Sequence, residues 1–302
     1  MSITLTQLRS FLAVMRTGSI TAAADELVVT QPSVSAAVAA LSRELGTPLT
    51  QREGRGVRPT EAGTAFAPFA SDVIGLLDTG RRAAHEAAGL AVQRLRLAAV
   101  TTAAESFVPP LMRAFSTSRP DIGLTLAVGN RATVIELVLD HRADVALGGR
   151  PPSDPRVEAV AVALNDFVLI CAPDDPLVGD EPVFAEALAE RMWLLREAGS
   201  GTRALNEDFL RAEALTPQTL VLGSNGAIKQ AARAGFGLAF ISRDAVALEL
   251  EAGLLAELRV QRPPAPRRWY ALCSTVGPRS QAVDQFMAYA ASAPAGSVAA
   301  ER

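Results

Sequence analysis

Residues 18–35 have the sequence GSITAAADELVVTQPSVS, and this stretch decides the fold of the N-terminal region. It predicts a short helix from Ile20 to about Leu27, a tight connection, and a second helix that begins after Thr30. Thr30 is a good N-cap, and Pro32 stands in the first turn, where the missing N–H of proline costs nothing. Two short helices joined by a three- or four-residue turn predict a helix-turn-helix.

The flanking residues extend this region in both directions. Apolar residues at three- and four-residue spacing over 5–15 predict a preceding amphipathic helix that Gly18 ends. The glycine- and arginine-rich stretch 54–60 predicts an exposed basic loop or β-wing, and a long helix follows over 61–88. That helix carries an apolar stripe with few neighbours, so we expect it to pack as a short coiled coil against the same helix of a second subunit. The stripe consists of Phe66, Phe69, Val73 and Leu77.

The residues from 89 onward alternate short apolar runs with helical patterns, which predicts βαβ units. Two α/β lobes account for the pattern, with lobe I at about 92–162 and 268–302 and lobe II at about 163–267. The chain is expected to pass between the lobes near 161–165 and 263–268. The predicted strands are Leu95–Val100, Leu124–Val128, Val145–Leu147, Phe167–Ala172, Met192–Leu195, Thr219–Leu222, Leu238–Ile241 and Trp269–Cys273.

The composition bounds the class of protein. The 302 residues are 49% hydrophobic and 20% charged, which is ordinary for a globular protein, and the formal net charge of -3 gives no global attraction to nucleic acid. No secretory signal and no apolar run long enough to span a bilayer are visible, so we expect a cytoplasmic protein without a membrane partner. Cys171 and Cys273 lie singly in apolar runs, which excludes a disulfide framework, and no spacing indicates a metal site.

Three expected helix starts follow strands in the C-terminal part. Because ligands of open α/β sheets bind at the carboxyl ends of strands, these polar starts are expected to meet in one cleft and to bind a small anion. The alternative is ordinary helix capping, for which Ser, Thr and Asn are preferred anyway. No nucleophile with a base, phosphate-binding loop or dinucleotide fingerprint accompanies them, so no catalytic residue and no cofactor are predicted. The residues expected to bind this anion, the candidate effector of the protein, are Thr101, Thr102, Ser200, Gly201, Thr202, Arg203, Ser224 and Asn225.

The N-terminal pattern resembles the winged helix-turn-helix of the LysR-type transcriptional regulators. The residues that carry the resemblance are Ser10–Val14, Gly18–Leu27, Thr30–Ser35, Leu41, Leu45–Leu49, Arg52 and Thr60–Gly63. The resemblance implies an α/β multidomain protein: a DNA-binding domain at 1–60, a dimerising linker helix at 61–88, and a two-lobed effector domain of the periplasmic-binding-protein type at 89–302. The stretches 196–203 and 224–231 resemble the subgroup that includes the Calvin-cycle and cysteine-biosynthesis regulators, in which these loops face the effector.

The N-terminal region departs from the family at several positions, including the middle of the second helix of the helix-turn-helix, the recognition helix. Residues 36–40 lack the usual basic or amide side chain, Ser42 replaces an acidic residue and Thr50 a phenylalanine. Direct base contacts are then expected from Gln31, Ser33 and Ser35, with Pro32 in the same turn. Phosphate or minor-groove contacts are expected from Arg52, Arg55 and Arg58. The alternative is that the serines are merely good helix starters and the arginines a solvated loop.

These observations favour a DNA-binding transcriptional regulator that responds to a small anionic effector and forms a dimer or tetramer. Its expected partners are double-stranded DNA, the effector and itself, with RNA polymerase as a candidate. One rival is an enzyme or solute-binding protein that uses the α/β lobes alone, but neither an export signal nor a catalytic constellation supports it. A second rival is a DNA-binding protein with a vestigial effector cleft.

Overall fold

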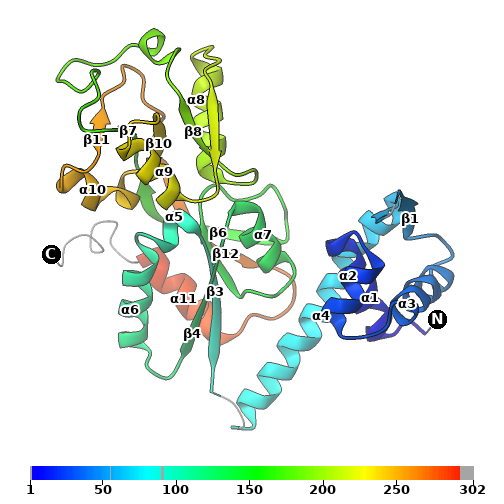
Figure 1. Ribbon diagram of the computed structural model, residues 1–302. Coiled ribbons are helices and arrows are strands. Elements are labelled where there is room, and N and C mark those ends of the chain that lie inside the picture. The colour runs from blue at the N-terminus through cyan, green and yellow to red at the C-terminus, as the bar shows by residue number, and fades with distance from the viewer. Residues whose placement is uncertain (1, 55, 90–91, 293–302) are drawn as a thin grey trace. The chain divides into compact units, whose positions relative to one another are not determined.

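The computed structural model describes residues 2–54, 56–89 and 92–292, and the chain divides into two compact units (Figure 1). The first unit comprises the residues up to Ala91 together with 139–142, and the second comprises the rest. Arg55, one of the predicted wing residues, lies outside the described residues.

The first unit contains the predicted helix-turn-helix. Gly18 ends the first helix in a left-handed conformation with φ 64°, and Thr30 Oγ1 accepts a hydrogen bond from the backbone N–H of Ser33 at the start of the third helix. Phe11 and Leu41 are fully buried between the helices, so the apolar periodicity of the sequence marks the core correctly. The elements are α1 Leu5–Thr17, α2 Ile20–Leu27, α3 Gln31–Glu44, β1 Thr50–Glu53, β2 Gly56–Pro59 and α4 Glu61–Ala87.

The predicted β-wing is present as an antiparallel pair of strands, β1 and β2, in which Arg52 pairs with Val57. Helix α4 begins directly after the wing, where Thr60 Oγ1 accepts from the Gly63 N–H at 3.0 Å. The backbone of Leu49 lies close against this first turn, because a Cβ at Gly63 would meet the Leu49 carbonyl oxygen at 2.0 Å. The wing and α4 are therefore fixed to the helical core.

Lobe I of the second unit is built on a five-stranded sheet in the order β4-β3-β5-β12-β6. Helices α6 and α11 cover one face, where Phe115 and Phe286 pack edge to face at 5.0 Å, and α7 covers the other face through Val134 and Val138 (Figure 1). The elements are β3 Arg94–Val100, α5 Thr101–Ala104, α6 Val108–Ser118, β4 Gly123–Gly129, α7 Arg131–Leu139, β5 Val145–Gly148, β6 Val157–Asn165, β12 Arg267–Ser274 and α11 Gln281–Ser292.

Lobe II contains a three-stranded antiparallel sheet, β10-β7-β11, and a parallel pair, β8-β9, which an isolated bridge from Trp193 to Leu238 connects. Trp193 is fully buried and packs against Phe209 and Phe240 at the centre of the lobe. The elements are β7 Phe167–Cys171, η1 Ala185–Leu188, β8 Trp193–Arg196, α8 Gly201–Ala212, β9 Thr219–Leu222, α9 Asn225–Arg233, β10 Ala239–Ser242, η2 Arg243–Ala245, α10 Ala247–Glu251 and β11 Ala256–Leu258.

All eight strands predicted from the apolar runs are present, within two residues of their predicted bounds. The interpretation of 161–165 as a mere passage between lobes was incomplete, because these residues form the second half of the nine-residue strand β6. The sequence alone did not indicate this strand, because its small residues are stabilised by pairing with β12, which lies more than 100 positions further along the chain. The short strand β11 was also not predicted.

Three further observations concern the described residues. None of their helices is long and apolar enough to cross a membrane. No group of three or more His, Cys, Asp or Glu side chains within them could hold a metal ion. Cys171 and Cys273 are both buried and unpaired, and burial raises the pKa of the Cys171 thiol to about 12.

Candidate functional site

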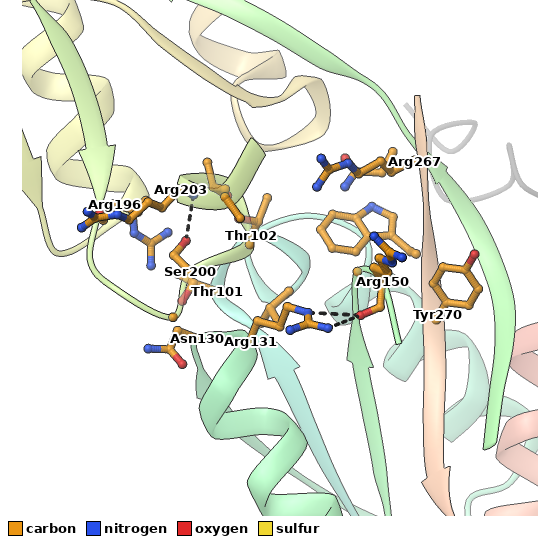
Figure 2. Close-up of a pocket in the computed structure, with 18 of the residues that line it drawn as sticks. Thr101, Thr102, Asn130, Arg131, Arg150, Arg196, Ser200, Arg203, Arg267 and Tyr270 are labelled. Atoms are coloured by element: carbon orange, nitrogen blue, oxygen red, sulfur yellow. Dashed lines mark hydrogen bonds between the residues drawn. The ribbon is translucent and has the colours of Figure 1, made fainter. Parts of the chain in front are cut away.

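A cavity of about 1070 Å³ lies between the two lobes of the second unit (Figure 2). Residues of both lobes line it: Thr101 and Thr102 follow strand β3, Asn130 and Arg131 begin α7, and the turn 199–203 begins α8. Because the strands that precede these turns end at the cavity, the site stands where open α/β sheets bind ligands. Of the predicted effector residues, the cavity brings together Thr101, Thr102, Ser200, Gly201, Thr202 and Arg203.

The turn before α8 presents hydrogen-bond donors to the cavity. Gly199 has a left-handed φ of 84°, and Ser200 caps the helix by accepting from the backbone N–H of Arg203 at 3.4 Å. A hydroxyl that accepts in this way keeps its own proton for another acceptor. The 12-residue helix α8 adds the partial positive charge of its N-terminus, so this turn suits an anion.

Ser224 and Asn225 lie apart from the cavity wall, unlike the other predicted residues. Ser224 caps α9 by accepting from the Ala227 N–H at 3.1 Å. Asn225 is fully buried, with 0% of its surface exposed, and its side chain contacts protein groups only. The sequence correctly predicted that Ser224 and Asn225 stand at the start of a helix. Residues at a helix start can contact a ligand only when no neighbouring lobe covers them. Here Thr102 and Glu105 of lobe I cover Asn225.

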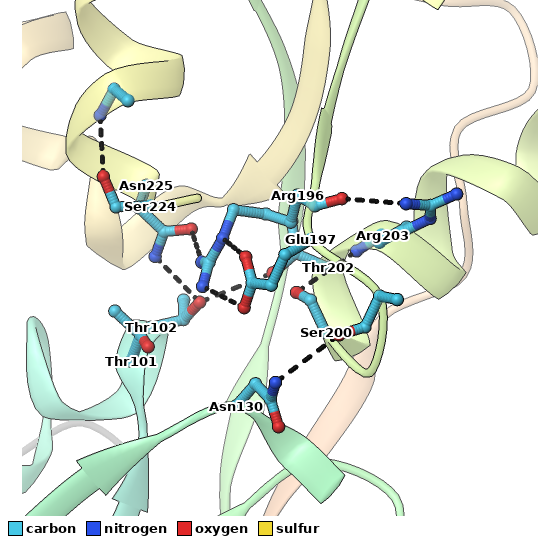
Figure 3. A network of polar contacts seen from close by, with 12 residues as sticks. Thr101, Thr102, Asn130, Arg196, Glu197, Ser200, Thr202, Arg203, Ser224 and Asn225 are labelled. Atoms are coloured by element: carbon cyan, nitrogen blue, oxygen red, sulfur yellow. Dashed lines mark hydrogen bonds and ion pairs between the residues drawn. The ribbon is translucent and has the colours of Figure 1, made fainter. Parts of the chain in front are cut away.

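Behind the cavity wall, Asn225 belongs to a network that connects the lobes (Figure 3). Its amide donates to Thr102 Oγ1 at 2.9 Å and to Glu105 Oε2 at 2.8 Å, and its oxygen accepts from Arg196. Arg196 is only 3% exposed and makes a two-pronged ion pair with Glu197 at 2.7 and 3.0 Å. Burial alone would raise the pKa of Glu197, but the hydrogen bonds from Arg196 and from the backbone, together with the charge of Arg196, outweigh burial and hold this pKa below its ordinary value.

Sequence reasoning missed the arginines of the cavity other than Arg203. Six arginines line it: Arg131, Arg150, Arg196, Arg203, Arg267 and Arg268. Arg203 donates to Glu207 at 2.7 Å, which compensates its charge. Arg267 pairs with Asp208 at 3.3 Å. Arg131 begins α7 and Arg150 follows β5, so their position after a strand was a signal that could have found them. Arg196 ends β8, and Arg267 and Arg268 begin β12, so no such signal marked them.

Two buried polar atoms of the cavity wall have no hydrogen-bond partner among the described residues. They are Nε1 of Trp269 and Oδ1 of Asn165, and both residues lie on β12 and β6, the strands at which the chain passes between the lobes. Unpaired buried polar atoms are uncommon in folded proteins. A β-bulge between Trp269 and Tyr270 interrupts the pairing of β12 with β6 directly beside Trp269.

The candidate DNA surface lies on the first unit. Gln31, Pro32, Ser33 and Ser35 are all exposed at the N-terminal end of α3, while Val34 between them is buried. This alternation is what a helix needs to pack on its own domain and still reach base edges in a major groove.

The wing residues are exposed as well, but they differ in their partners. Arg58 lies 3.6 Å from Glu53 across the hairpin, whereas Arg52 faces the groove between α3 and the wing. The Thr30 and Ser33 hydroxyls share a hydrogen bond at 2.8 Å, which occupies part of the bonding capacity of Ser33.

The apolar stripe of α4 divides into two parts. Phe66 packs on Phe11 of α1 with ring centroids 5.8 Å apart, and so belongs to the core of the DNA-binding unit. Phe69, Val73 and Leu77 are exposed, Phe69 by 68%. Three large apolar side chains on one helical face that no other described residue covers are typical of an interaction surface.

A winged helix-turn-helix and a two-lobed α/β domain with a donor-lined cavity define a ligand-responsive DNA-binding regulator. Two family profiles match the chain: "LysR substrate binding domain" over residues 88–295 and "Bacterial regulatory helix-turn-helix protein, lysR family" over residues 5–64. The chain belongs to the LysR family of bacterial transcriptional regulators, and it is a regulator rather than an enzyme.

Named relatives match over nearly their whole length. The chain is 34% identical to the HTH-type transcriptional activator CmpR of Synechocystis over 287 residues, which are 95% of this chain and 94% of CmpR. It is 37% identical to the RuBisCO operon transcriptional regulator of Allochromatium vinosum, over 89% of each chain. Identity to the transcriptional regulator CbbR of Sinorhizobium medicae is also 37%, over 95% of this chain and 93% of CbbR.

Solved structures agree with the fold. The regulatory domain of Synechocystis CcmR in complex with 2-PG superposes with a TM-score of 0.62 at 30% identity, over 66% of this chain and 96% of that one. The LysR family regulator CbnR superposes with a TM-score of 0.62 at 23% identity, over 95% of this chain and 98% of CbnR. The second match shows that the fold is shared over 95% of this chain, and the first concerns the lobes that form the cavity.

Proposed function

We propose that this protein regulates transcription of a carbon-fixation operon and that a small anionic metabolite in the inter-lobe cavity changes its action on DNA. The single observation that carries the proposal is the chemistry of the cavity wall: hydroxyls, a helix N-terminus and six arginines surround it, against two carboxylates, Glu207 and Asp208. This local excess of positive charge stands in a chain whose formal net charge is -3. An anion gains from such a surrounding, whereas an uncharged aromatic ring does not.

The relatives supply the class of metabolite. CcmR, whose regulatory domain resembles the lobes of this chain, was solved with 2-PG, and two relatives are named for the RuBisCO operon. We extend both properties to this protein: its effector is a short phosphorylated carboxylate, and its target is an operon for carbon fixation. A ligand shifts a protein between two conformations only by its difference in affinity for them, so the expected coupling is about 1 to 3 kcal/mol.

The proposed role as a transcriptional regulator also implies three macromolecular partners: DNA, a second copy of the chain and RNA polymerase. Double-stranded DNA binds at α3 and the wing, and a second copy of the chain packs on the exposed stripe of Phe69, Val73 and Leu77. A regulator that acts on bacterial promoters acts in the cytoplasm and meets RNA polymerase there.

The test is a mobility-shift titration of the full chain on promoter DNA of the RuBisCO operon of its own genome. Affinity should change by about 5- to 150-fold when 2-phosphoglycolate or 3-phosphoglycerate is added, as expected for ordinary allosteric coupling. Glycerol and benzoate, an uncharged and an aromatic control, should have no effect. Retardation that is equal on promoter and random DNA, or a response to benzoate alone, would contradict the proposal.

A further inference from the structure

Three of the six arginines of the cavity have no carboxylate partner among the described residues: Arg131, Arg150 and Arg268, of which Arg268 is exposed to solvent. The other three have one. Arg196 pairs with Glu197, Arg203 with Glu207 and Arg267 with Asp208. Within residues 92–292, by contrast, no Asp or Glu lies within ion-pair distance of Arg131 or Arg150. Arg131 is half-buried, where an uncompensated charge costs free energy unless an anion lies beside it, whereas Arg150 is exposed at the cavity wall.

Arg131 and Arg150 are held next to each other. Nε and Nη2 of Arg131 donate to the backbone carbonyl oxygen of Arg150 at 3.1 and 3.0 Å, as Figure 2 shows. These bonds use the carbonyl dipole to fix the Arg131 side chain, but they bring in no negative charge. Burial, and then the charge of Arg150, lower the pKa of Arg131, which is the expected result of two like charges in one wall.

The position of Arg131 relates this pair to the donor-lined turn. A Cβ placed on Gly201 would lie 3.8 Å from Cδ of Arg131, so the stem of Arg131 runs along the first residue of α8. The neighbouring Asn130 donates to the Ala198 carbonyl oxygen at 3.4 Å, which joins the start of α7 to the same turn. The arginine pair and the turn with Ser200 therefore adjoin, and both line one cavity.

We propose that Arg131 and Arg150 form a dianion subsite beside the Ser200 turn, and that this pair makes the cavity selective for a phosphorylated over an unphosphorylated carboxylate. The inference rests on the proposed function. Two guanidiniums with two uncompensated charges match a phosphate, which carries close to two negative charges at neutral pH. The Ser200 turn, with neutral donors and a helix N-terminus worth about half a charge, matches a carboxylate. Because the subsites adjoin, the two groups belong to one short molecule.

The test compares two ligands on four forms of the full chain by calorimetry. The ligands are 2-phosphoglycolate and glycolate, which share the carboxylate and differ in the phosphate. The forms are wild type, Arg131→Gln, Arg150→Gln and the control Arg113→Gln, whose arginine is exposed on α6 and does not line the cavity. We expect each cavity variant to bind 2-phosphoglycolate at least tenfold more weakly than wild type and Arg113→Gln do. In the same variants, the ratio of the affinity for 2-phosphoglycolate to the affinity for glycolate should also fall.

Urea unfolding of each variant shows that a loss of binding is not a loss of fold. If both cavity variants bind 2-phosphoglycolate as tightly as wild type, the subsite is wrong and the proposed function stands. If both ligands weaken by the same factor, the arginines do not select the phosphate, and the inference is also overturned. If the wild type binds neither 2-phosphoglycolate nor 3-phosphoglycerate, the proposed class of effector fails, and the subsite fails with it.

Discussion

The side-chain amide of Asn225 donates a hydrogen bond to Thr102 Oγ1 over 2.9 Å, although 123 positions separate the two residues. Asn225 begins helix α9 in lobe II, and Thr102 lies in the short helix after β3 in lobe I. The second amide proton goes to Glu105, and the amide oxygen accepts from the buried guanidinium of Arg196. One neutral side chain thus connects the lobes and completes the bonding of a buried charge.

Replacing Asn225 by alanine should destabilise the effector domain by about 3 kcal/mol, because hydrogen bonds to charged groups are lost and Nη1 of the buried Arg196 loses its acceptor. Urea unfolding of the full chain, followed by circular dichroism, measures the change. Gln230→Ala is the matched control, since Gln230 is exposed on the same helix. Equal unfolding midpoints for the two variants would show that the network contributes little.

Gly63 and Gly80 lie on the same helix, α4, but differ in their surroundings. A Cβ on Gly63 would lie 2.0 Å from the Leu49 carbonyl oxygen, and one on Gly80 would meet nothing within 4 Å. Gly63→Ala should therefore lower the stability of the DNA-binding unit by about 2 kcal/mol or more. Gly80→Ala should raise stability by up to about 1 kcal/mol, because alanine is the better helix former. Thermal unfolding of both variants checks this prediction: the melting temperature should fall for Gly63→Ala and rise for Gly80→Ala.

Val28 ends α2 in a left-handed conformation with φ 56°, and its side chain is 90% exposed. A β-branched residue is strained there, while asparagine tolerates this region. Val28→Asn should stabilise the protein by about 1 kcal/mol, seen as a higher melting temperature. Val29→Asn, at the next exposed position but without a positive φ, should give no such gain. An unchanged or lower melting temperature for Val28→Asn would refute the strain argument.

Gln31 is exposed at the start of α3, where its amide can make a bidentate contact with adenine. Gln31→Ala should cost about 1 to 3 kcal/mol on the preferred site and leave binding to random DNA nearly unchanged. Salt titrations of mobility shifts on both DNAs measure this.

Arg52→Ala gives the contrasting pattern. A lost phosphate contact should weaken binding to every sequence and flatten the salt slope by about one unit. If the two variants behave alike on specific and random DNA, Gln31 does not contact bases.

Val73 is exposed between Phe69 and Leu77 on α4, and burial of such a side chain in a dimer is worth about 1.5 to 3 kcal/mol. Val73→Glu should therefore dissociate the oligomer or weaken it strongly, as analytical ultracentrifugation measures. Thr64→Glu adds the same charge at an exposed position on the opposite side of the helix and should sediment as wild type. A Val73→Glu variant that keeps the wild-type sedimentation coefficient would place the dimer interface elsewhere.

Local patterns in the sequence were sufficient for much of the architecture. The helix-turn-helix, its Thr30 cap and the eight strands depend on contacts within a few residues and on the period of apolar side chains, both of which are visible in the chain itself. The turn around Ser200 was found for the same reason, because capping is local.

The sequence by itself determined the order of the helices and strands, the helix that we propose to contact DNA, and the donor-rich turns. Only the tertiary structure decided which of these turns reach the cavity: Ser200 does, whereas Asn225 is covered by Thr102 of the other lobe. It also decided that Phe66 packs in the core on Phe11 while Phe69 stays exposed, and that Arg131 and Arg150 share one wall without a counter-charge. The physical reason is that burial and charge compensation depend on groups far apart in the chain, and no local pattern contains them.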